Sequence, residues 1–514
     1  METLSETPWD VIIAGTGLSQ SLLALALSRS GKKVLHLDQN KYYGGSEAAF
    51  SLDEAQEWVN SVNQHPGRSP FQDAVLSTSA SENSEHPVKL ASNRAYTLSL
   101  SPSFLYARSS LISILLSSRV FRQLEFMAVG NWWIHSTEQK NAENSDSGAA
   151  RAFQRVPGKR EDIFADTRIG MKSKRTLIRF LRHISKPMDE DSGEDDKDLS
   201  PPFPEYLSAN FDVPQDLHNP LLSLSLSQLR QEETSASYAV SRIKRHLGSI
   251  GALGPGFGGV VSKYGCGAEI LQVACRASAV GGGVYALDTG IASLEDGKPG
   301  SEDEYPVTVQ LSNGESLRTK TVVGSVWDLS TQEQSLECTQ VARSVSIVSS
   351  EFTSLFSGTM DGAPIPASVV VMFPGESLGN PQSPPVYLQV HSSDTGECPR
   401  QQSIIYGSVS LPRSQGQELL ECAVDRLVQA EGPHAVVSWS MRYTQLGRLA
   451  TDATQPSIQT HSPHVLSFPP PSLDLAFEDD TVDLVKQAWT HIVGDEVDHD
   501  DFMIFEDREG TSDE

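Results

Sequence analysis

The start of the chain combines short apolar runs with a helical pattern. The run WDVIIAG at residues 9–15 is short, rich in β-branched residues and ended by glycine, which predicts a buried parallel strand. SQSLLALALSRSG predicts a helix that ends at Gly31, and KKVLHLD predicts a second strand that ends at Asp38. A strand, a helix and a strand within about thirty residues are typical of the opening unit of a nucleotide-binding α/β fold.

Helical spacing dominates the next part of the chain. Three stretches place apolar residues three and four positions apart, and each predicts an amphipathic helix. They are residues 101–126, 170–184 and 235–251. Together they predict a mostly helical domain over residues 103–251. The polar segments 60–93 and 186–202 have no such period, and each predicts a loop.

Strand patterns return after Gly251. In residues 306–325, apolar and polar residues alternate on both sides of Asn313-Gly314. This pattern predicts a hairpin with a type I′ turn, in which both turn residues have a positive φ. Further strand patterns follow at residues 343–350, 367–373, 385–393, 403–411 and 435–445.

The last periodic segment is TVDLVKQAWTHIVG at residues 481–494, which predicts an amphipathic helix. The terminus that follows is acidic, with FMIF at residues 502–505 inside it, and we expect it to be mobile. The whole pattern predicts an α/β fold with a β-rich, discontinuous domain of the FAD/NAD(P)-binding type. Residues 1–102 and 252–505 would form this domain, the helical domain would be inserted into it, and residues 506–514 would be an acidic tail.

Length and charge narrow the functional classes. A chain of 514 residues suggests roughly two or three domains. Its formal net charge of -26 argues against nucleic-acid binding, because that needs a cationic surface. Its N-terminus has no signal-peptide pattern, and its apolar runs stay below the ~18–20 residues of a membrane helix, so we expect a cytoplasmic protein.

Cysteines and histidines give little sign of chemistry. The five cysteines are odd in number and never in C-x-x-C spacing, so neither a disulfide framework nor a zinc site is expected. The 13 histidines form no H-E-x-x-H motif, and no G-x-S-x-G motif is present. The sequence therefore predicts no metal site and no catalytic group.

The glycine loop VIIAGTGLSQS leaves the question of a cofactor open. Gly15 and Gly17 fit the first two positions of G-x-G-x-x-G/A, but Gln20 stands at the third, where helix and strand should touch. Asp38 lies where an acidic group would bind a ribose hydroxyl. These residues favour the fold over a bound dinucleotide.

Three motifs resemble the Rab GDP-dissociation inhibitor and Rab escort protein family. They are HLDQNKYYGG at residues 36–45, FLYARSSLISILLSSRVFRQLEF at 104–126 and YGCGAEILQVACRASAVGGGVYAL at 264–287. The resemblance implies the fold of FAD-dependent oxidases, used without a cofactor and without catalysis. It also implies that the first domain binds GDP-bound Rab GTPases and that the helical domain shelters geranylgeranyl groups.

The same resemblance implies a Rab-binding platform. Its residues would be Tyr43, Arg94, Glu269, Gln272 and Arg276. Seven residues, or two helical turns, separate the glutamate from the second arginine, so both can lie on one helix face. The alternative is a plain surface ion pair worth ~0–1 kcal/mol.

Two departures from the family pattern stand in the third motif. Ala268 is inserted before Glu269, and Val284 replaces a threonine that is common among the inhibitors.

Added segments favour the escort branch of the family over the inhibitor branch. They lie near residues 60–93, 186–202 and 374–402, and the segment 468–507 resembles fungal escort proteins. The escort branch implies docking on the catalytic α/β heterodimer of Rab geranylgeranyltransferase, for which Ile243 and Leu247 are the candidate contacts, and transient delivery of Rab to membranes. An inhibitor that recycles Rab is the alternative, and an FAD-dependent oxidoreductase is the alternative outside the family.

Overall fold

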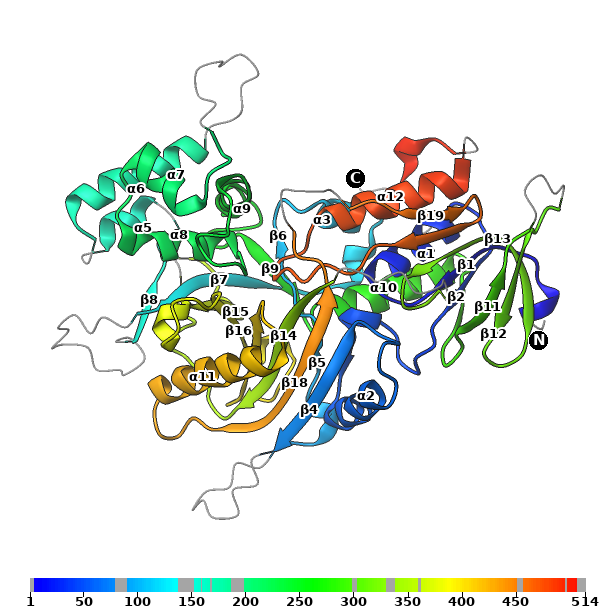
Figure 1. Cartoon of the computed structure of the whole chain (residues 1–514), viewed down its shortest axis with the longest axis horizontal. Coiled ribbons are helices and arrows are strands. Elements are labelled where there is room, and N and C mark those ends of the chain that lie inside the picture. Colours follow the sequence, from blue (N-terminus) through cyan, green and yellow to red (C-terminus); the bar gives the residue numbers. More distant parts are fainter. Residues whose placement is uncertain are drawn as a thin grey trace.

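The computed structural model contains two large sheets and a group of helices (Figure 1). It describes residues 4–78, 90–136, 152–158, 160–166, 169–185, 198–297, 303–329, 338–358, 362–450, 456–494 and 497–505. Most of the predicted acidic loop at 186–202 and the predicted tail at 506–514 lie outside these residues. None of the described helices is long and apolar enough to cross a membrane.

The first sheet has eight strands and confirms the predicted opening unit. β1 (Trp9–Ala14), α1 (Leu18–Arg29) and β2 (Val34–Leu37) follow one another, and β1 pairs with β2 in parallel. The strand order is β10-β2-β1-β13-β12-β11, and β20 extends the parallel part from β13. The other bounds are β10 Val284–Ala286, β11 Ile291–Glu295, β12 Val307–Leu311, β13 Ser316–Ser325, β19 Gln459–Ser462 and β20 Val465–Phe468.

Apolar clusters lie on the two faces of this sheet. α1 packs against α10 (Gly267–Val280) and α12 (Asp480–Val493) over one apolar cluster. The antiparallel strands β11, β12 and β13 contribute to the cluster that holds Trp9 and Leu35 from the other face. This arrangement confirms the predicted FAD/NAD(P)-binding class, because the glycine loop lies at the carboxyl end of β1.

The predicted hairpin is present, but its turn type is different. β12 and β13 pair in antiparallel on both sides of the turn. Gly314 has φ +90°, whereas Asn313 is not among the residues with positive φ, so the turn is not type I′. The Gly314 N–H donates to the Leu311 carbonyl at 3.0 Å, which makes a four-residue turn with only the glycine in the left-handed region.

The second sheet has ten strands in the order β4-β18-β14-β17-β16-β15-β7-β9-β6, with β8 paired to β7. The bounds are β4 Phe71–Thr78, β6 Leu105–Tyr106, β7 Phe126–His135, β8 Phe153–Arg155, β9 Gly259–Ser262, β14 Thr339–Val348, β15 Ser368–Phe373, β16 Val386–Ser392, β17 Ser403–Val409 and β18 Val437–Gly447. All five strands predicted between residues 343 and 445 are confirmed. A small sheet pairs β3 (Ala49–Phe50) with β5 (Leu98–Ser99).

One segment expected as a loop contains regular structure. Within 60–93, the helix α2 (Leu52–Gln64) continues to residue 64 and β4 pairs with β18, while residues 79–89 lie outside the described part. Cross-strand pairing, which local polarity does not reveal, fixes β4. Within 374–402, the predicted strand is β16, which lies between β15 and β17.

The remaining helices gather at one end of the molecule (Figure 1). They are α5 Arg160–Ala165, α6 Met171–Ile184, α7 Phe203–Phe211, α8 His218–Ser225 and α9 Ala236–Ser249. The helices predicted at 170–184 and 235–251 are therefore confirmed. The helix predicted over 101–126 is wrong in extent. Only α3 (Ser110–Ser117) is an α-helix there, while β6 precedes it and β7 begins at Phe126. The helix α11 (Arg413–Glu431) covers the ten-stranded sheet.

The C-terminal part is more ordered than its charge suggests. α12 buries Val482, Val485 and Trp489, as predicted. The prediction of a mobile terminus is wrong for residues 502–505, because Met503 is 2% exposed and Phe502 and Phe505 pack against the same cluster. Apolar FMIF residues outweigh the surrounding charge once an apolar surface is available.

A buried group of charges joins the helices to the rest of the molecule. On α9, Arg242 pairs with Glu478, and Arg245 lies 3.6 Å from Glu478 and 3.3 Å from Asp479. Asp479 in turn accepts hydrogen bonds from Ser109 Oγ and the Ser110 N–H at the start of α3. The division of domains at residues 103 and 251 stays a prediction.

Candidate functional site

The glycine loop keeps the backbone of a dinucleotide-binding turn. Gly15 has φ +86°, and its N–H donates to the Leu37 carbonyl at 2.8 Å. Gly17 is the N-cap of α1, so the first N–H groups of that helix point out of the loop. This is the geometry that would present backbone donors to a pyrophosphate.

The chain's own polar side chains lie against that loop, in a pocket that Gly15, Gly17 and Asp328 help to line. A Cβ added to Gly15 would meet Asp328 Oδ2 at 2.2 Å, and a Cβ added to Gly17 would meet Gln20 Oε1 at 3.0 Å. The Leu18 N–H, the first of α1, donates to Glu47 Oε2 at 3.2 Å. A carboxylate of the chain thus binds the helix N-terminus where a phosphate would otherwise bind.

Gln20 therefore has a structural partner. Its side chain is buried, and Nε2 lies 3.5 Å from Asp328 Oδ2. Asp328 also accepts hydrogen bonds from the Ser325 N–H and Oγ. The residue that breaks the glycine motif thus faces a carboxylate that comes from more than 300 positions away.

Asp38 does not face a ribose. Its Oδ2 accepts from the Thr16 N–H at 3.0 Å and from Thr16 Oγ1 at 2.5 Å. Its Oδ1 accepts from the Asn40 N–H and side-chain amide at 2.7 Å and 2.9 Å. Both carboxylate oxygens are used to hold the loop and the end of β2 together.

Burial raises the pKa values of three carboxyl groups near the loop, those of Asp38, Glu47 and Asp328. Burial raises the pKa of Asp38 and the pKa of Glu47. Burial, together with the nearby Asp38 carboxylate, raises the pKa of Asp328 to about 7. Asp328 and Glu47 lie at the glycine turn and the helix N-terminus, where the negative phosphates of a dinucleotide would lie, so these two residues do not fit that cofactor.

The turn that contains Tyr43 lies directly on the glycine loop. A Cβ added to Gly45 would meet Gly17 N at 3.0 Å, and the Gly44 N–H donates to Thr16 Oγ1 at 2.9 Å. Tyr43 is half-buried, and its hydroxyl lies 2.7 Å from Ser21 Oγ on α1.

The Tyr43 ring also contacts two other rings in edge-on geometry. The ring centroids of His36 and Tyr285 lie 5.9 Å and 5.8 Å from it. Tyr43 therefore fixes the turn and leaves only part of its ring for a partner.

The platform residues on α10 share one face, as their spacing predicts. Arg276 Nη2 lies 3.0 Å from Glu269 Oε1, and the two side chains are 54% and 26% exposed. Gln272 is exposed between them. Pairing within the chain is worth little at such exposure, so both groups stay available to a charged partner.

Arg94 lies apart from the other four platform residues. It is exposed in a short 3₁₀ turn and lines a shallow hollow with Asp53, Glu54 and Glu57 of α2. Its segment still reaches α10, because Gly265 packs against the side chains of Ala49 and Thr97. The structure thus places Arg94 near the start of α10 and Tyr43 behind its middle.

Exposed apolar side chains extend the α10 face, and the sequence prediction missed them. Tyr264 is 49% exposed before the helix, Val280 is 68% exposed at its end, and Leu287 is 38% exposed just past the edge strand β10. Val284, which departs from the family pattern, is 38% exposed on β10 itself. Large apolar groups exposed around a charged pair are typical of a protein-binding surface. Their membership of the third motif was the available signal.

One candidate transferase contact does not fit the structure. Ile243 has no exposed surface and lies in the core of the helical group, so it cannot touch a partner without a separation of the helices. Leu247 is partly buried against the same core. The helical period predicted the apolar face correctly, but that face is turned inward.

One group of side chains has the chemistry and spacing to hold a metal ion. Among the described residues, Cys266, His391 and Glu397 are the cluster whose ligand atoms lie within 4.8 Å of one another. They come from widely separated positions, so cysteine spacing could not predict them.

A protein-family model described as GDP dissociation inhibitor matches residues 5–402 of the chain. This chain belongs to the GDP dissociation inhibitor family. The protein named Rab proteins geranylgeranyltransferase component A from Candida albicans is 30% identical over 432 residues, which are 81% of this chain. These residues are 62% of that relative, so the chain spans less than two thirds of its length.

Solved structures agree with the fold. A Rab GDI from Plasmodium falciparum has a TM-score of 0.67 and 19% identity, covering 95% of this chain and 99% of that chain. An oxidoreductase from Methanosarcina mazei has a TM-score of 0.58 and 10% identity, covering 93% and 99%. These two neighbours are named for different functions, so the fold alone does not indicate which function this chain has. Family membership places the chain among non-catalytic proteins, as the sequence predicts.

Proposed function

We infer that this chain is a Rab escort protein. It binds newly made, GDP-bound Rab GTPases and presents them to the catalytic α/β heterodimer of Rab geranylgeranyltransferase. It then holds the lipidated product in the cytosol and delivers it to membranes. One observation supports this proposal most. A relative that is 30% identical over 81% of the chain is named as component A of that transferase.

The geometry of α10 supports a protein partner. Its exposed face offers a carboxylate, an amide and a guanidinium in a row, flanked by exposed Tyr264 and Val280. Apolar area would supply affinity, while the charges would fix the orientation of Rab. The chain's own carboxylates contact the glycine loop beneath, and α1, which follows the loop, holds the Tyr43 hydroxyl through Ser21.

Charge reversal at Arg276 tests the platform. Arg276→Glu places two acidic groups side by side, and we expect Rab binding to weaken at least tenfold by titration calorimetry. The matched control is Arg413→Glu on α11, which breaks a similarly exposed ion pair between Arg413 and Asp73 of β4. The exchange Glu269→Arg/Arg276→Glu keeps an ion pair but inverts it, so we expect it to bind as poorly as the single variant. Wild-type affinity in both α10 variants would refute the platform.

A transfer assay separates escort from inhibitor. Unprenylated GDP-bound Rab, the catalytic heterodimer and geranylgeranyl diphosphate are mixed with the chain, and lipidated Rab is measured by mass spectrometry. An escort protein makes transfer depend on the chain. Binding of prenylated Rab without any support of transfer would favour the inhibitor that recycles Rab, which the family description also supports.

The helical group is the proposed shelter for the lipid. Removing a geranylgeranyl chain from water contributes roughly 0.8 kcal/mol per CH₂. Leu247 remains the candidate contact for the transferase on α9, next to the buried Ile243.

A further inference from the structure

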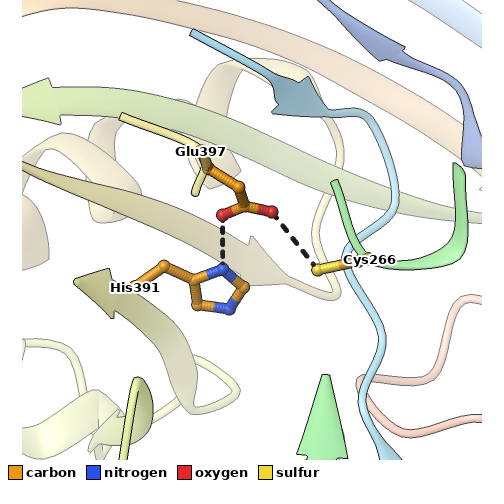
Figure 2. Close-up of side chains that lie close together, drawn as sticks. All are labelled: Cys266, His391 and Glu397. Atoms are coloured by element: carbon orange, nitrogen blue, oxygen red, sulfur yellow. Dashed lines mark hydrogen bonds and ion pairs between the residues drawn. The ribbon is translucent and has the colours of Figure 1, made fainter. Parts of the chain in front are cut away.

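We propose that Cys266, His391 and Glu397 form a site for one Zn²⁺ ion beneath the start of α10. Figure 2 shows the three side chains turned toward one another, with Glu397 between the other two. Glu397 Oε2 lies 2.6 Å from His391 Nδ1, and Cys266 Sγ donates to Glu397 Oε1 at 3.5 Å.

All three ligands are withdrawn from water. The side chains of His391 and Glu397 are 0% exposed, and Cys266 is 1% exposed. His391 Nε2 is buried and has no hydrogen-bond partner in the described part of the chain. An ion bound at His391 Nδ1 would replace the hydrogen bond between that nitrogen and Glu397.

The donor set selects zinc. A thiolate, an imidazole and a carboxylate are the ligands of tetrahedral zinc sites, whereas magnesium and calcium take oxygen ligands. The ligand atoms all lie within 4.8 Å of one another, so the widest pair would have to approach by roughly 1 Å around the ion. His391 Nδ1 and Glu397 Oε2, now 2.6 Å apart, would have to separate by somewhat less than that. Three protein ligands leave one position of the tetrahedron for a water molecule.

The chemistry of binding is a proton exchange. The Cys266 S–H bond breaks, its proton passes to solvent, and a sulfur–zinc bond forms in its place. The proton between His391 Nδ1 and Glu397 Oε2 moves to His391 Nε2 or to solvent, so that a nitrogen–zinc and an oxygen–zinc bond can form. No electron is transferred. Thr395 Oγ1 donates to Glu397 Oε2 at 3.3 Å and would hold the carboxylate in position.

The location gives the ion a structural role. Cys266 is the residue directly before α10 and has φ +54°. The Tyr264 N–H donates to the Thr395 carbonyl at 2.9 Å, and the Thr97 N–H donates to the Glu397 carbonyl at 3.0 Å. The site would therefore tie together the start of α10, the segment after β16 and the segment that follows Arg94. This proposal does not depend on Rab binding.

The test uses the full chain without a histidine tag. The protein is incubated with ZnSO₄, separated from free metal by gel filtration and analysed by atomic emission. We expect about one zinc ion per chain and a rise in melting temperature that a chelator reverses. With CoCl₂ in place of zinc, we expect the absorption band of a thiolate bound to cobalt.

Variants assign the thiolate. Cys266→Ser should lose the thiolate band and weaken metal binding at least tenfold. The control is Cys398→Ser, which removes a buried thiol one residue from Glu397 and should keep the band. Loss of the band in the control alone would overturn the assignment.

Zinc content and the cobalt band of the wild-type chain test the proposal even if the Cys266→Ser variant does not fold. A folded wild-type chain that retains less than roughly a tenth of an ion and shows no thiolate band would overturn the proposal. The cluster would then be only a hydrogen-bonded group. Cobalt bound without a thiolate band would also overturn it, because surface histidines and carboxylates would then be the ligands.

Discussion

At the scale of single residues, the glycine loop shows how a binding geometry is reused. Gly15 and Gly17 keep the turn, but the side chains of Asp328, Glu47 and Gln20 lie against it. The helix N-terminus still attracts a negative group, and here the chain supplies that group itself. The change in function thus needed few alterations of the backbone.

The raised pKa of Asp328 predicts how stability depends on pH. The pKa rises from 3.8 to about 7 in the folded protein. Between these values the folded state binds more protons than the unfolded state, so stability falls as pH rises and is constant above about 7. The slope of this contribution is about 1.4 kcal/mol per pH unit at most.

Asp328→Asn removes that contribution. We expect the free energy of unfolding of the variant, relative to wild type, to increase by about 2–4 kcal/mol between pH 4 and pH 8. Urea unfolding at several pH values measures it. Asp296→Asn changes an exposed carboxylate and should follow the wild-type curve. Parallel curves for Asp328→Asn and wild type would contradict the prediction.

At the scale of elements, short apolar segments decide order within polar sequence. Residues 499–505 follow α12 and dock on α1 and α3. The Ser117 Oγ donates to the Met503 carbonyl at 3.0 Å, and Arg29 lies 4.9 Å from the centroid of the Phe505 ring. Met503 and Ile504 are neighbours in this segment, yet Met503 lies in the core and Ile504 is exposed to solvent.

This alternation gives a matched pair of substitutions. Met503→Ala truncates a side chain that is 2% exposed, and we expect the free energy of unfolding to fall by about 2–4 kcal/mol. Ile504→Ala, at a side chain 59% exposed, should change stability by less than about 0.5 kcal/mol. Thermal unfolding of both variants measures the difference, and equal losses would show that the segment is not docked.

At the scale of the whole molecule, the helical group is held by charge as well as by apolar packing. Arg242 and Arg245 on α9 face Asp474, Glu478 and Asp479 from the segment before α12. Arg242 and Glu478 are 10% and 12% exposed, so neither can lose its partner cheaply.

Arg242→Met should therefore loosen the helical group. It leaves the Glu478 carboxylate without its main partner, and we expect the free energy of unfolding to fall by about 3–5 kcal/mol. Calorimetry should resolve an early transition of the helices. The double variant Arg242→Met/Glu478→Leu should recover part of the loss, because the Glu478 carboxylate is no longer left without Arg242. The recovery is partial, because Asp474 and Arg245 each lose one partner.

A surface pair provides the comparison. Arg230→Met breaks the exposed pair with Glu233 and should lower the free energy of unfolding far less than Arg242→Met does, because solvent screens an exposed pair. A similar loss in both single variants would mean that the buried charges do not join the two parts.

The sequence by itself determined the local elements. The opening strand, helix and strand, the five later strands and the helices at 171–184, 236–249 and 480–493 all follow from apolar period, because that period reflects which face an element buries. The i, i+7 placement of Glu269 and Arg276 is equally local. The glycine loop and the three motifs were sufficient for the fold and the family.

Only the tertiary structure decided which distant residues meet. Asp328 reaches Gly15, β4 pairs with β18, Ile243 turns into the core, and Cys266 meets His391 and Glu397. None of these contacts has a period or a fixed spacing, because the path of the chain between the partners sets each of them. The function of the loop depended on such contacts, since its glycines are compatible with a cofactor and the carboxylates in front of them are not.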